Sequence, residues 1–122
     1  MEQRVGIFIA DKEACVRSAL RLLLGQEAGL RIAGDAGNHD ALLAGLTATA
    51  PRLLVLDCEL PGLAGRRPVD ALKSRWPSLK VVALGTSQDA GLSRCLGADA
   101  LCSKLAPPEG LIECVHRLLA EV

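Results

Sequence analysis

The chain has 122 residues, which fits a single domain spanning 1–122 that buries about two thirds of its unfolded surface around one core. Half of the residues are apolar, 23% are charged, and 14 basic side chains balance 14 acidic ones, so net charge indicates neither nucleic acid nor an anionic membrane as a partner. We therefore expect a protein or a small ligand as partner. We also expect a cytoplasmic protein, because the apolar runs are short and the N-terminal residues MEQRV lack a signal-peptide layout.

Short apolar runs alternate with helical repeats from the start of the chain. Residues 4–10 predict a buried parallel strand, because they are apolar on both faces and too short for a typical helix. Apolar residues then repeat at helical spacing from about Ala14, and Gly29 is a helix stop signal. Residues 30–36 predict a second strand, after which Asn38 can cap a helix.

The same alternation continues to the last helix, which opens near Pro108 and carries one apolar face. The elements before it are a strand at 52–57, a loop at 59–65, a helix at 67–76, a strand at 80–85, a short helix at about 90–96 and a strand at 98–103. Five strands alternating with five helices predict an α/β fold, in which a parallel sheet has helices on both faces. The natural candidate is a flavodoxin-like doubly wound sheet with strand order 2-1-3-4-5.

Charged residues follow the ends of three predicted strands. Asp11 and Asp57 end the first and third, and Lys104 lies just past the fifth. In doubly wound sheets, ligands bind beyond the carboxyl ends of the strands, near the switch point between the first and third. The three residues are therefore predicted to converge on one crevice.

Three segments carry a resemblance to a known family: IFIADKEACVR, LLVLDCELPGLAG and GADALCSKLAPPE. They resemble the signature segments of response-regulator receiver domains of the CheY-like superfamily, particularly the LuxR/NarL-type branch whose receivers precede a helix-turn-helix output. The resemblance covers essentially the whole chain. It implies that Asp57 is the phospho-acceptor, that Lys104 contacts phosphate, and that Asp11, Asp57 and the backbone carbonyl of Glu59 hold Mg²⁺.

Four departures from that family pattern affect the same function. Lys12 stands where the second acid is expected, Gly85 where a hydroxyl senses the phosphoryl group, with Thr86 adjacent, and Leu101 where an aromatic switch residue is usual. Only 11 residues separate Gly85 from Gly97, fewer than the family resemblance implies, which predicts a shortened fourth helix. With Lys12 present, the crevice charges sum to about zero, and an ammonium about 4 Å from a metal would repel it by roughly several kcal/mol.

We expect the Lys12 ammonium to pair with Asp57 or Asp11 in place of the metal. It could instead point to solvent, in which case Glu13 could serve as a substitute ligand. Gly85 could simply be a tight turn with positive φ. The five cysteines, at positions 15, 58, 95, 102 and 114, lack CxxC spacing and are expected to be reduced core residues, with Cys58 a loop filler rather than an exposed redox thiol.

The leading hypothesis is an atypical or pseudo-receiver that is not an enzyme beyond self-catalysed phosphoryl transfer, and that signals through protein contacts. It expects no cofactor, a histidine kinase or regulatory protein as partner, no nucleic-acid or membrane contact, and a homodimer through the last helices and strand. One rival is a working receiver phosphorylated on Asp57 with Mg²⁺ bound. The other is a small-ligand or thiol redox binder, which predicts a pocket near Gly62 and Gly85, whereas we expect no mass change on mild oxidation.

Overall fold

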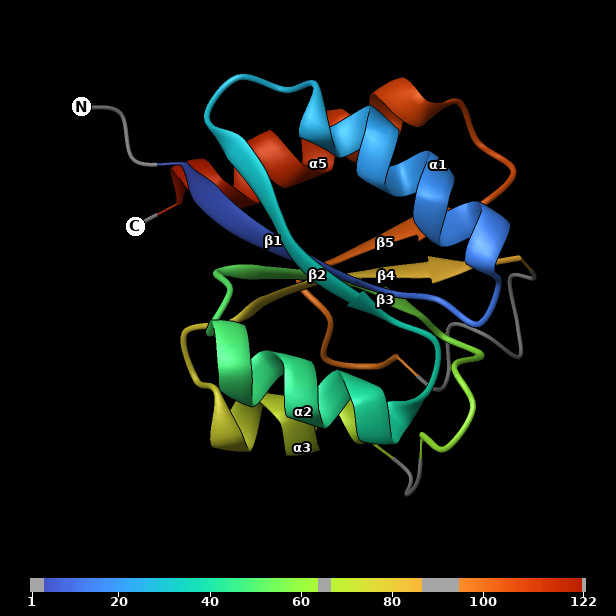
Figure 1. Cartoon of the computed structure of the whole chain (residues 1–122), viewed down its shortest axis with the longest axis vertical. Coiled ribbons are helices and arrows are strands. Elements are labelled where there is room, and N and C mark those ends of the chain that lie inside the picture. Colours follow the sequence, from blue (N-terminus) through green and yellow to red (C-terminus); the bar gives the residue numbers. More distant parts are fainter. Residues whose placement is uncertain (1–3, 64–66, 87–94, 122) are drawn as a thin grey trace.

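The fold is that of a computed structural model, which describes residues 4–63, 67–86 and 95–121 (Figure 1). Its strands and helices alternate along the chain, and their bounds agree with the predicted ranges to within two residues except at the first helix's end. In chain order they are β1 Val5–Ala10, α1 Ala14–Gly25, β2 Leu30–Ala36, α2 His39–Thr49, β3 Leu53–Asp57, α3 Pro68–Arg75, β4 Lys80–Gly85, β5 Ala100–Ser103 and α5 Pro108–Ala120. The predicted helix at 90–96 falls largely outside the described residues.

The five strands form one parallel sheet in the order β2-β1-β3-β4-β5, as predicted. β1 and β3 are hydrogen-bonded neighbours, with Ile7 opposite Leu53 and Ala10 opposite Leu56. Every residue of β3 is buried, which explains its unbroken apolar run: a central parallel strand is covered on both faces. The order places the ends of β1 and β3 side by side, where the switch point of this topology lies.

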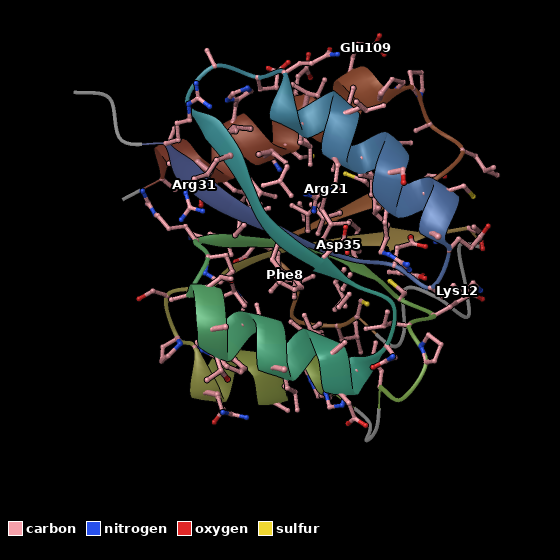
Figure 2. The ribbon with its side chains drawn as sticks, in the orientation of Figure 1. Phe8, Lys12, Arg21, Arg31, Asp35 and Glu109 are labelled. Carbon is pink, nitrogen blue, oxygen red and sulfur yellow. The ribbon has the colours of Figure 1, made fainter. Side chains whose placement is uncertain are left out.

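Helices cover the sheet on both sides: α1 and α5 on one face and α2 and α3 on the other (Figure 1). The apolar side chains divide accordingly into two layers. Leu20, Leu24 and Val115 belong to the layer under α1 and α5. Phe8 belongs to the other layer and points from β1 toward α2, where the absence of a side chain at Gly45 makes room for its ring (Figure 2).

Local signals explain where the helices begin and end. The Asn38 side chain accepts a hydrogen bond of 2.9 Å from the Ala41 N–H, which confirms the predicted cap of α2. Gly29 has φ of +84°, a left-handed conformation, but α1 already ends at Gly25 and Gly29 serves the turn into β2. Among the helices of the described residues, none combines the length and apolarity needed to cross a bilayer.

The environment of the cysteines differs from the prediction that all five are core residues. Cys58 and Cys95 are buried, and Cys58 is indeed no exposed thiol. Cys15, however, is exposed on α1, while Cys102 and Cys114 are half-buried. For Cys102 the prediction failed because no residue of β5 is more than half-buried.

Candidate functional site

Two carboxylates lie at the carboxyl ends of neighbouring strands. Asp57 is the last residue of β3, and Asp11 directly follows β1. Both side chains are fully buried, and they are the buried charged residues of the described chain. Because β1 and β3 pair in parallel, their ends meet at one edge of the sheet and bring the two acids together.

Backbone amides hold both carboxylates in the same way. The Glu13 N–H donates to Asp11 Oδ1 at 2.9 Å, and the Glu59 N–H donates to Asp57 Oδ1 at the same distance. In each case the donor is two residues beyond the acid, the short-range arrangement that Asp commonly makes in a turn. The Lys12 N–H adds a third bond, to Asp57 Oδ2 at 3.2 Å. The two acids are thereby oriented by the turns that follow them.

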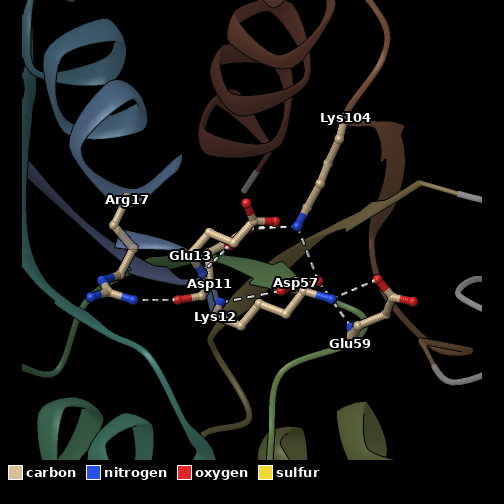
Figure 3. Close-up of polar contacts among 7 residues, drawn as sticks. All are labelled: Asp11, Lys12, Glu13, Arg17, Asp57, Glu59 and Lys104. Carbon is tan, nitrogen blue, oxygen red and sulfur yellow. Dashed lines mark hydrogen bonds and ion pairs between the residues drawn. The ribbon is translucent and has the colours of Figure 1, made fainter. Parts of the chain in front are cut away.

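Lys104 bridges the two acids, so the three charged residues converge on one crevice as predicted. Its ammonium lies 2.8 Å from Asp11 Oδ2 and 3.3 Å from Asp57 Oδ1 (Figure 3). Both atoms of the shorter contact are enclosed and lack an aligned hydrogen-bond partner among the described residues, so the contact is an ion pair. Partial burial alone would lower the pKa of Lys104, but the carboxylates of Asp11 and Asp57 outweigh it and raise the pKa above 10.5.

The Lys12 side chain does not pair with Asp11 or Asp57, and that prediction is wrong. Its ammonium lies 3.1 Å from Glu59 Oε2, at the mouth of the site (Figure 3). The hydrogen bond to Glu59 is the main cause of a raised pKa of Lys12, and the charge of Asp57 adds to it. The long lysine stem carries its charge outward, where both partners keep contact with water, at a lower desolvation cost than deep in the crevice.

Arg17 also supports the site, and the sequence interpretation missed it. Its guanidinium donates to the backbone carbonyl of Asp11 at 2.7 Å and lies within 3.8 Å of a carboxylate oxygen of Asp35. Arg17 lies one helical turn after Glu13, on the face of α1 next to the turn that follows β1. Its position on that face could have indicated a role at the site. The side chain of Glu59 was missed for a different reason, because its partner is 47 positions away along the chain.

The remaining positions lie at or directly after the end of β4, and on β5. Gly85 is the last residue of β4, pairs with Ser103 and accepts a hydrogen bond of 2.9 Å from the Lys104 N–H. Its interpretation as a tight turn with positive φ is therefore wrong: it is a strand residue. Thr86 is exposed directly after it. Leu101, at the position of the expected aromatic residue, lies on β5 and is 49% exposed.

The residues present do not fit Mg²⁺ as they are arranged. Three carboxylates face two ammonium groups, which leaves a single net negative charge for a doubly charged cation. Each oxygen of Asp11 and Asp57 already contacts an N–H group or an ammonium. Within residues 4–63, 67–86 and 95–121, no three His, Cys, Asp or Glu side chains gather as a metal-binding group. Glu13 contributes its backbone N–H here.

Known proteins resemble the chain along nearly its whole length. A family model described as "Response regulator receiver domain" matches residues 7–116. The transcriptional activator protein ExaE of Pseudomonas putida is 30% identical over 119 residues, covering 95% of this chain and 56% of that protein. The nitrate/nitrite response regulator protein NarL of Escherichia coli K12 is 25% identical, with 93% and 54% covered. The chain thus spans about half the length of the curated relatives it matches.

Solved structures share the fold. A structure of the isolated REC domain of RcsB from Salmonella enterica serovar Typhimurium, in the presence of phosphomimetic BeF3−, superposes with a TM-score of 0.86. Its sequence is 23% identical, and the match covers 98% of this chain and 91% of that one. An RcsB response regulator structure from Salmonella typhimurium, described in terms of conformational dynamism for DNA interaction, gives a TM-score of 0.87 at 23% identity, with 98% and 62% covered.

Proposed function

Because the chain belongs to the response regulator receiver domain family, we propose that it is an atypical receiver that signals through protein contacts, with weak or absent Mg²⁺-dependent phosphorylation of Asp57. The observation that carries the proposal is the Lys12 ammonium, paired with Glu59 at the mouth of a site whose two buried acids already share Lys104. A fully active receiver needs a divalent cation to neutralise the charge that develops during phosphoryl transfer.

The charge distribution explains why Lys12 acts on the ion from the rim. The charge of Asp57 contributes to the raised pKa of Lys12, although the Lys12 ammonium bonds Glu59. The ammonium is therefore within electrostatic range of Asp57. A cation approaching Asp57 meets one ammonium at the mouth and a second on the floor. Mg²⁺ prefers several oxygen ligands in octahedral geometry and gives up its water reluctantly. Two fixed ammonium groups make that exchange less favourable.

Signal transmission through contacts is proposed for the surface formed by β5 and the segment that leads into α5. Leu101 on β5 is 49% exposed and Leu105, after the strand, is 81% exposed. A contact at this surface would remove the apolar surface of both side chains from water. The proposed partner is a histidine kinase, a regulatory protein or a second copy of the chain. The proposed location is the cytoplasm. Leu105→Asp should weaken self-association measured by sedimentation, with Leu22→Asp on α1 as a matched exposed control.

The test of phosphorylation is incubation with Mg²⁺ and an acyl phosphate, followed by intact-mass measurement. We expect the wild-type chain to stay essentially unmodified, while Lys12→Asp gains one phosphate that Asp57→Asn abolishes in the double variant. If the wild-type chain itself takes up a phosphate that is lost in Asp57→Asn, the proposal fails. A failure would leave the family assignment intact, because that depends on residues 7–116 as a whole.

A second candidate is a working receiver that accepts phosphate on Asp57. Lys104 favours it, since its ammonium lies 3.3 Å from Asp57 Oδ1, where it could also contact a phosphoryl group on that carboxylate. The rival ligand-binder hypothesis predicted a pocket near Gly62 and Gly85. The larger described cavity instead lies between α1 and α5, and neither glycine lines it.

A further inference from the structure

Two cysteines face each other across the layer between the sheet and α5. Cys102 lies on β5, on the half-buried side of the strand that faces α1 and α5, and Cys114 lies on α5. Their sulfur atoms are 3.5 Å apart, and both are free thiols. Cys114 lies three residues after Leu111 and directly before Val115, both buried on the helix face that packs on the sheet.

We propose that Cys102 and Cys114 form a reversible disulfide, and that this pair is an oxidation site of the chain. At 3.5 Å the two sulfur atoms are already in van der Waals contact, and an S–S bond of about 2.05 Å needs only a small further approach. That approach has to come from rotation of the two side chains, because the backbone of β5 is held to β4 by the pairing of Leu84 with Cys102. The proposal is independent of the function proposed for Asp57.

A cavity gives the pair access to a small oxidant. It has a volume of about 500 Å³, lies between α1 and α5, and its wall includes Cys102, Cys114, Lys104 and Leu20. Since a water molecule occupies about 30 Å³ in the liquid, a molecule as small as hydrogen peroxide has ample room. The other buried cysteines lack this route: Cys58 and Cys95 are fully enclosed in the opposite layer.

The environments of the two sulfurs assign them different roles. The Arg117 guanidinium lies 4.0 Å from the Cys114 sulfur and places a positive charge beside it. Burial, together with the Cys114 contact, raises the pKa of Cys102 to about 11, so this thiol stays protonated at neutral pH. Cys114 is therefore the attacking residue and Cys102 the resolving residue.

The chemistry balances with hydrogen peroxide as the oxidant. The Cys114 thiolate attacks one peroxide oxygen, the O–O bond breaks, and protonation of the leaving hydroxide gives water and a sulfenic acid on Cys114. The Cys102 sulfur then attacks the Cys114 sulfur, the S–O bond breaks, and a second water leaves with the Cys102 proton. Two thiols and one peroxide give one disulfide and two waters. A dithiol reductant reverses the reaction by thiol exchange.

Cys58 and Cys95 provide an internal comparison. The hydrogen bond to Cys95, followed by burial, raises the pKa of the Cys58 thiol far above its ordinary value, so its thiolate is scarce. Cys15 is exposed on α1, where it can link two chains or form adducts. Selective oxidation at Cys102 and Cys114 departs from the expectation, stated above, that mild oxidation leaves the mass unchanged.

The experiment uses the whole chain carrying Cys15→Ser, which removes cross-linking between chains. The folded protein is treated with a small excess of hydrogen peroxide, quenched with catalase, denatured and alkylated. We expect a loss of two hydrogen atoms in intact mass, two alkylated thiols instead of four, and full recovery after dithiothreitol. Digestion with trypsin and Asp-N separates Cys95 from Cys102 and should give a peptide that links Cys102 to Cys114.

Serine variants test the assigned roles. In the same background, Cys102→Ser should accumulate a sulfenic acid on Cys114 that dimedone traps, whereas Cys114→Ser should leave its thiols reduced. The proposal is overturned if the Cys15→Ser protein keeps four reactive thiols after peroxide, or if the linked peptides contain Cys58 or Cys95. Because these outcomes are read on the parent protein, they hold even if a serine variant fails to fold.

Discussion

The floor and the rim of the candidate site carry the same kind of ion pair in different surroundings. On the floor, Lys104 has a side chain 11% exposed between two fully buried acids. At the rim, Lys12 and Glu59 are 38% and 45% exposed. A buried pair is costly to break, because the partner that remains is an uncompensated charge away from water, whereas an exposed pair is worth little to stability.

The two ion pairs have different roles: the floor stabilises the fold, and the rim affects which ions can bind. The floor holds the ends of β1, β3 and β5 together by charge, since Asp11, Asp57 and Lys104 follow or end those three strands. The rim adds a positive charge that contributes little to the fold. We therefore expect that Lys12 can be changed to alter ion binding without unfolding the chain, and that Lys104 cannot be changed so freely.

The largest effect is expected on the floor, for Lys104→Met. Two buried carboxylates then lose their cation, and the free energy of unfolding should fall by about 2–3 kcal/mol, a value reduced from that of fully enclosed pairs because Lys104 retains some solvent contact. Urea denaturation measures the change. Lys80→Met is the matched control, because Lys80 pairs with Glu121 at the surface. Equal stability of the two variants would contradict a structural role for the floor.

At the rim, Lys12→Asp should raise the affinity for Mg²⁺ at least tenfold, into the millimolar range, because it replaces an ammonium with an oxygen ligand and frees Glu59. Isothermal titration calorimetry measures it. Lys12→Met, which removes the positive charge without adding an acid, should give an intermediate gain. If neither variant binds Mg²⁺ better than the wild type, Lys12 is not what excludes the ion.

The pH dependence of stability distinguishes the floor further. The pKa of Lys104 is raised above 10.5 in the folded chain, so its contribution is complete below about pH 10.5 and is lost as the pH rises through the folded-state pKa. The difference in unfolding free energy between wild type and Lys104→Met should thus be constant from pH 8 to 10 and shrink above. The absence of tyrosine simplifies this alkaline range. A difference that grows with pH would contradict the assigned ion pair.

The smallest effect is expected for the stability of Lys12→Met. Both rim partners are exposed, so losing the pair should leave the denaturation midpoint unchanged within error. Its backbone N–H, which donates to Asp57, is retained in the variant. A clear loss of stability would show that the rim is structural and would remove the distinction between the two regions.

The fold was predictable because its signals are local and repeated. β3 is apolar at every position before its aspartate, as expected for a strand covered on both faces. Asn38 marks the start of α2 because its side chain caps the helix. The parallel topology then follows from strands that alternate with helices. The convergence of Asp11, Asp57 and Lys104 followed from the same rule, because all three lie at carboxyl ends of the strands.

The partner choices of long side chains were not predictable in this way. Lys12 pairs with Glu59, 47 positions away, and not with Asp11 or Asp57. The reach of the side chain and the cost of desolvation decide among the three acids, and sequence spacing shows neither of these. The alternative interpretation of Gly85 as a tight turn was wrong, because strand pairing with Ser103 continues through it. The Cys102 and Cys114 contact depends on packing of β5 against α5, although their positions on the inward faces of both elements were readable.

The most direct test of the account is a crystal structure grown or soaked with Mg²⁺. We expect the Lys12 ammonium to stay on Glu59, Lys104 to stay between Asp11 and Asp57, and no ion to coordinate either buried acid. Magnesium bound to the Asp57 carboxylate, with the Lys12 side chain turned away from the site, would contradict the account and favour an ordinary phosphorylation-controlled receiver.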